Sequence, residues 1–108
     1  MTAGRKMSEQ KNLKEVRATD DNGGPDPGNY YEGVTVWVSK LQDDGYRCEI
    51  LAESGVVQDI DHIPYKKTVL RGSAQEIKEE FKEAFPQEFL QYFLRAFNRA
   101  IDQLETEE

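Results

Sequence analysis

The sequence is poor in the residues that build covalently or metal-stabilised folds. It holds one cysteine and one histidine in 108 residues. A single cysteine excludes an internal disulfide, and small secreted domains usually need several, so we expect a reducing, cytoplasmic setting. One histidine and one cysteine also fall short of the three or four ligands that a zinc site requires. We therefore expect neither a disulfide nor a metal or other cofactor.

Long apolar runs and positive charge are scarce as well. No segment approaches the roughly 18 apolar residues of a membrane span, and the opening "MTAGRKMSEQKNLKEV" has no apolar secretion core. Fourteen basic against 21 acidic residues give a net charge of -7, which repels a phosphate backbone. The composition predicts a small acidic protein that binds neither membranes nor nucleic acid.

The chain divides into a polar beginning and an apolar remainder. Residues 1–29 carry few sizeable apolar side chains and close with "DDNGGPDPGN", where glycine and proline oppose regular structure. A mass of 12.4 kDa suits one domain with one modest core. We predict a disordered tail over 1–29 and a single domain over 30–108.

Alternating apolar residues after this tail predict strands. The pattern is clearest at 34–39 and 46–52, with "DDG" at 43–45 as the turn of a hairpin. A second turn is expected at 53–55, followed by short strands at 56–60 and 65–71. Connections this short predict an antiparallel meander of three or four strands.

The period then changes to that of helices. "SAQE" from Ser73 to Glu76 is a capping box that predicts a helix over 73–85, and Pro86 predicts a break before a second helix ending at Leu104. The expected fold is α+β, with a small antiparallel meander packed against two C-terminal helices.

Residues with catalytic chemistry are few. Asp59, Asp61 and His62 could suggest a metal ion or a general base, but aspartate and histidine before Ile63-Pro64 are typical of a turn. Cys48 shares a strand face with apolar neighbours, which favours a buried, inert thiol. We expect no enzyme activity.

A basic group, Lys66, Lys67 and Arg71, could together with Trp37 suggest a sheet that stacks RNA bases. The acidic total argues against it. Lysines on an edge strand, which oppose its pairing with a strand of another chain, explain the pattern more simply.

The second helix carries more apolar surface than a small sheet needs. Beside the stripe led by Phe89 and Phe93, Leu90, Leu94 and Phe97 form a second edge, and we expect this edge to meet another chain. Glu88 and Asp102 would rim that contact. The candidate binding residues are therefore Leu90, Leu94, Phe97, Glu88, Asp102 and Trp37.

The function expected from these patterns is a non-catalytic protein–protein interaction or regulatory module. It would use the aromatic C-terminal helix or the sheet face, and the most economical partner is a second copy forming a homodimer. The alternative is a small acidic inhibitor or nucleic-acid mimic that binds a basic partner through the carboxylates of the helices.

Overall fold

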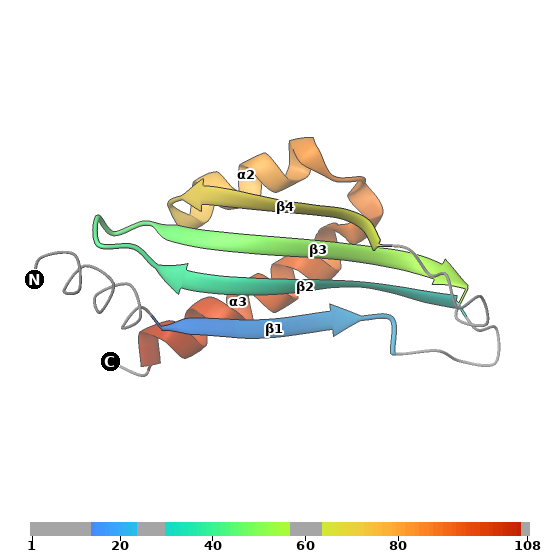
Figure 1. Ribbon diagram of the computed structural model, residues 1–108, viewed down its shortest axis with the longest axis horizontal. Coiled ribbons are helices and arrows are strands. Elements are labelled where there is room, and N and C mark those ends of the chain that lie inside the picture. Colours follow the sequence, from blue (N-terminus) through green and yellow to red (C-terminus); the bar gives the residue numbers. More distant parts are fainter. Residues whose placement is uncertain (1–13, 24–29, 57–63, 107–108) are drawn as a thin grey trace, which may run out of the picture.

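A four-stranded antiparallel sheet is the framework of the computed structural model, which describes residues 14–23, 30–56 and 64–106. The strands are β1 (Glu15–Asp21), β2 (Tyr30–Lys40), β3 (Tyr46–Val56) and β4 (Pro64–Gly72). They lie in the sheet in chain order, so each strand pairs with its neighbour in sequence (Figure 1). The β2–β3 turn closes with the amide of Leu41 donating to the carbonyl of Gly45, and Asp44 takes a φ of 70° there.

Two helices follow the sheet. Helix α2 (Ala74–Ala84) begins at the expected capping box, in which the Glu76 amide donates to Ser73 Oγ and the Ser73 amide donates to Glu76 Oε1. Pro86 then precedes a short 3₁₀ turn, η1 (Gln87–Phe89), and helix α3 (Leu90–Thr106). Because proline disfavours a helical residue before it, Phe85 is extended and the two helices are separate.

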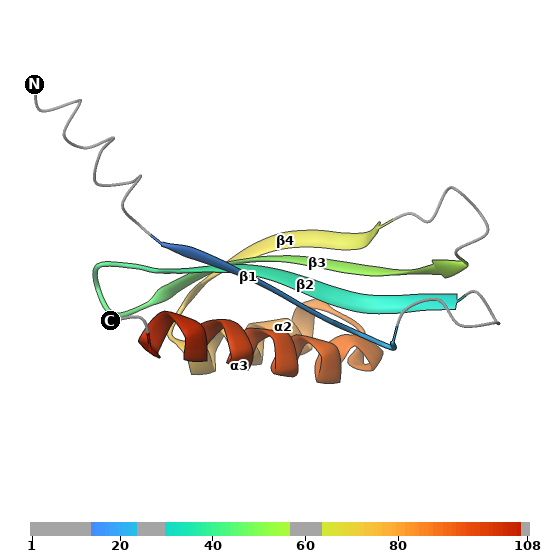
Figure 2. The same ribbon diagram turned by 90° about the horizontal axis from the view of Figure 1, so that it is seen from below.

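Both helices cover the same face of the sheet, as Figure 2 shows. Helix α3 packs along β1 and β2, while α2 lies beside β4. The strands turn alternate residues toward them, including Val34, Val36 and Val38 of β2 and Cys48 and Ile50 of β3, all with no exposed surface. We call this helix-covered side the inner face.

Stacked aromatic rings fill the space between the helices and the inner face. Phe81 lies 4.4 Å from Phe85 and 4.0 Å from Phe93, and Phe93 lies 5.0 Å from Phe97, measured between ring centroids. Large buried rings supply much of the apolar area that stabilises a domain this small.

The predicted α+β fold, with an antiparallel meander and two C-terminal helices, is confirmed. Two details of the prediction are wrong. Residues 15–21, expected within a disordered tail, form edge strand β1, and the expected turn at 53–55 continues β3 as far as Val56. The rest of the predicted tail and strand 56–60 lie outside the described residues, apart from Lys14, Asn22, Gly23 and Val56.

Within the described ranges, no helix combines the length and the apolar character that crossing a bilayer requires.

Candidate functional site: the outer face of the sheet

The face of the sheet opposite the helices is the largest candidate surface. No described element covers it (Figure 2). Residues whose side chains project from this outer face alternate with the inner, buried ones. They are Glu15, Arg17, Thr19 and Asp21 of β1; Tyr31, Gly33, Thr35, Trp37 and Ser39 of β2; Arg47, Glu49, Leu51, Glu53 and Gly55 of β3; and Lys67, Val69 and Arg71 of β4.

An apolar centre occupies the middle of the outer face. Trp37 and Leu51 are half-buried, and Val69 is 41% exposed, one of two large apolar side chains that are clearly exposed in the described chain. Along β2, the small side chains of Thr35 and Ser39 flank Trp37 and are only 6% and 8% exposed. The surface is therefore uneven, with large side chains standing beside small, sunken ones.

Cations surround this apolar centre. The guanidinium of Arg17 lies 6.0 Å from the ring centre of Trp37, within the range of a cation–π contact. Glu49 accepts Lys67 at 3.1 Å and Arg47 at 3.8 Å, so its charge is compensated. Arg71, by contrast, forms no ion pair with any residue in the described ranges, and its charge is available at the surface.

The two ends of the outer face differ in charge. Arg47 and Arg71 are cross-strand partners near the β2–β3 turn, and we call this pair the basic end, although Glu15 of β1 lies in the same row. At the other end Asp21 and Glu53 flank Gly33, and we call this pair the acidic end.

The pKa of Tyr31 reflects the negative charge of the acidic end. Burial, the charges of Asp21 and Glu53, and a hydrogen bond to Asp21 raise the pKa of Tyr31 to about 12. Its hydroxyl lies so close to Gly33 that a Cβ there would approach it to 2.7 Å. A side chain at Gly33 would thus displace Tyr31 from the acidic end.

The helical residues predicted to bind a partner are placed differently from one another. Phe97 has no exposed surface and stacks on Phe93, so its side chain belongs to the core and is not available to a partner. Leu90 and Leu94 are half-buried and pack against that core. Glu88 and Asp102 are exposed, as expected of a rim.

A groove of about 370 Å³ lies at the elbow between α2 and α3. It is lined by Phe81, Lys82, Phe85, Pro86, Gln87 and Leu90. Phe81 and Phe85 are 0% and 5% exposed, so the apolar surface actually open to an occupant is small. The outer face is the broader of the two candidate surfaces, because it extends across four strands.

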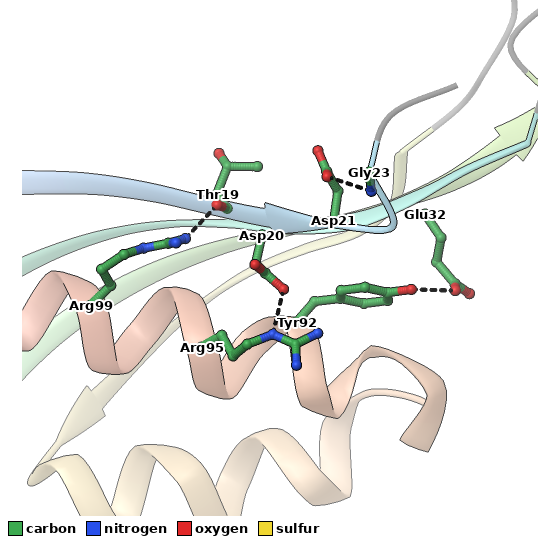
Figure 3. A network of polar contacts seen from close by, with 8 residues as sticks. All are labelled: Thr19, Asp20, Asp21, Gly23, Glu32, Tyr92, Arg95 and Arg99. Carbon is green, nitrogen blue, oxygen red and sulfur yellow. Dashed lines mark hydrogen bonds and ion pairs between the residues drawn. The ribbon is translucent and has the colours of Figure 1, made fainter. Parts of the chain in front are cut away.

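A polar network that the sequence did not predict ties α3 to the sheet (Figure 3). Arg95 Nε donates to Asp20 Oδ2 at 2.9 Å, Arg99 donates to the carbonyl of Thr19 at 2.6 Å, and Tyr92 donates to Glu32 Oε1 at 3.1 Å. Burial and the bond to Glu32 raise the pKa of Tyr92. Each carboxylate or carbonyl has a partner, so the network has a structural role.

Of the residues considered for catalysis, only Cys48 lies within the described part of the chain. Burial is the main cause that raises the pKa of the Cys48 thiol to about 12, which opposes formation of a nucleophilic thiolate. Asp59, Asp61 and His62 lie outside the described residues. Among those that are described, no three histidine, cysteine or acidic side chains are grouped so that they could hold a metal ion.

Comparisons with known proteins found no matching family model, no similar curated protein and no similar solved structure.

Proposed function

We propose that this chain is a non-catalytic module that binds another protein through the outer face of its sheet. The observation that carries the proposal is that Trp37, Leu51 and Val69 lie on neighbouring strands around Glu49, on a face that no described helix or strand covers. Sheets of this kind usually keep their uncovered face polar, so an apolar centre there marks an interaction surface. We place the module in the cytoplasm because its one thiol, Cys48, is buried and unpaired.

The composition of the outer face supports this function. Tryptophan, tyrosine and arginine are the residues most enriched among those that dominate binding energy, and Trp37, Tyr31, Arg17 and Arg71 all belong to this face. The arrangement of an apolar centre within a charged border is typical of protein interfaces. Leu90 and Leu94 offer less apolar surface to a partner, because both side chains already pack on the core.

Affinity capture with matched variants tests the proposal. The full chain is immobilised and exposed to native lysate, beside Trp37→Asp for the outer face, Leu90→Asp for the elbow of the helices, and Glu79→Gln/Glu80→Gln/Glu83→Gln for the acidic surface of α2. Circular dichroism and thermal melting establish that each variant is folded. We expect a partner held by the wild type to be lost from Trp37→Asp alone.

Other outcomes contradict the proposal and point elsewhere. If the partner is lost from Leu90→Asp but still captured by Trp37→Asp, binding belongs to the helices. Loss from the triple glutamine variant, together with binding that weakens steeply as salt is added, would favour an acidic inhibitor or nucleic-acid mimic.

A further inference from the structure

We infer that the partner of the outer face is a second copy of this chain, packed sheet against sheet about a two-fold axis that runs across the strands. This inference rests on the proposed function, since it uses the same face. The uncovered face of a twisted sheet is readily covered by another sheet, with about 10 Å between them and strands within about 30° of each other. The charges, shapes and area of the face each favour a self-association of this geometry.

The charge pattern selects the direction of the axis. A two-fold axis perpendicular to the strands keeps the strand order and reverses the strand direction, so the basic end of one copy lies over the acidic end of the other. Arg47 is then opposite Glu53 of the second copy, and the symmetry forms this pair twice. An axis parallel to the strands would instead bring the two acidic ends together, where Asp21 and Glu53 repel their counterparts.

The shapes of the side chains also match under this axis. With the axis midway between Trp37 and Thr35 on β2, each Trp37 lies over the sunken Thr35 of the second copy. Thr35 is held in place by a bond between its Oγ1 and that of Thr19, at 2.8 Å. Large side chains opposite small ones interdigitate, which is how close-packed layers are built.

The outer face is large enough for a specific dimer interface. Four strands spaced about 4.8 Å apart, over about 25 Å of strand length, give a footprint of about 500 Å² on each copy. The two copies together reach about 1,000 Å², the level at which specific interfaces begin.

Three juxtapositions are less favourable, and they limit the expected affinity. Val69 of β4 comes over Lys67 of the second copy, so an apolar side chain faces a cation. Glu15 comes over Asp21 at the β1 edge, where water screens the repulsion. Leu51 comes over Glu49, whose carboxylate is already held by Lys67 and Arg47. We therefore expect a dimer that dissociates in the micromolar range rather than a permanent one.

Charge reversal across the axis is the test. Sedimentation equilibrium of the full chain is measured for the wild type, Arg47→Glu, Glu53→Arg and the double variant Arg47→Glu/Glu53→Arg. Each single reversal is expected to weaken the dimer about tenfold or more, and the double variant is expected to recover it. Residues 47 and 53 lie about 20 Å apart along one strand, so recovery cannot arise within a single copy. Glu79→Arg, an exposed reversal on α2, is the control that leaves association unchanged.

The outcomes separate this inference from the proposed function. A wild type that stays monomeric at high micromolar concentration overturns the homodimer, while loss of a different partner from Trp37→Asp would still support the proposed function. A dimer that tolerates both single reversals, or that the double variant fails to restore, also overturns the inference, because the copies then meet through another surface or another axis.

Discussion

Nε of Arg95 donates to Oδ2 of Asp20 at 2.9 Å, and this contact joins residues 75 positions apart in the chain. It connects the middle of α3 to the edge strand β1, and Arg99 adds a bond to the carbonyl of Thr19 one turn further along. Val16 of the same strand is 6% exposed and belongs to the core. Strand β1 is thus held by backbone pairing to β2, by the apolar side chains of Val16 and Ala18, and by two arginines of α3.

Removal of β1 should strongly destabilise the fold. A chain that begins at Asn22 loses the burial of Val16 and uncovers part of β2 and α3, which we expect to cost about 2 kcal/mol or more of the free energy of unfolding. Thermal and urea melts measure this. The control is a chain that begins at Lys14, which retains β1. Equal melting midpoints for the two truncated chains would show that β1 contributes nothing to stability.

The capping box of α2 should be worth about 1 kcal/mol. Ser73→Ala removes the oxygen that accepts from the Glu76 amide, and losses of this kind cost about 0.5–2 kcal/mol. Ser73→Asp is the matched control, because aspartate is also a good N-cap residue and should restore most of the loss. Urea denaturation compares the three chains. An alanine variant as stable as the wild type would show that the cap is not needed.

Alkaline pH should destabilise the protein in part through Cys48. Its pKa rises from 9.0 to about 12 in the fold, so the unfolded chain loses this proton first and stability falls as pH rises from about 9 to 12. Tyr31, raised from 10.0 to about 12, adds to the fall at the upper end of this range. Urea melts at increasing pH should therefore show a shallower decline for Cys48→Ala. Parallel declines in the two chains would contradict the assigned role of the thiol.

Several features of the fold could be read from local patterns. Alternation of Val34, Val36 and Val38 with polar neighbours predicted β2, and the capping box with Pro86 predicted both helix boundaries to within a few residues. Strand β1 could not be read this way. Its inner face carries Val16, Ala18 and Asp20, and the third of these is compatible with that face only because Arg95 reaches it from α3.

The extension of β3 was missed for a related reason. Glu53, Ser54 and Gly55 are common turn residues, yet here they pair with Gly33, Glu32 and Tyr31 of β2. Pairing across strands supplies what local propensity lacks, and a single sequence does not reveal it.

The candidate site was only partly predictable. Trp37 was proposed as a binding residue, and the structure puts it at the centre of the uncovered face. Leu51 and Val69 were not identified, because their significance depends on which strands lie beside β2. The prediction that Phe97 binds a partner was wrong, because its side chain stacks on Phe93 inside the core. Helical periodicity cannot distinguish one wide buried stripe from two separate apolar surfaces.

Fluorescence quenching of Trp37 tests the central claim most directly, because it is the only tryptophan of the chain and lies in the middle of the outer face. Acrylamide quenching is measured for the free monomer and then for the complex, formed either with a captured partner or by raising the concentration of the chain itself. If the outer face is the binding surface, quenching falls on binding and the emission maximum moves to shorter wavelength. A complex that forms while Trp37 remains as accessible as in the monomer would contradict a binding role for this face.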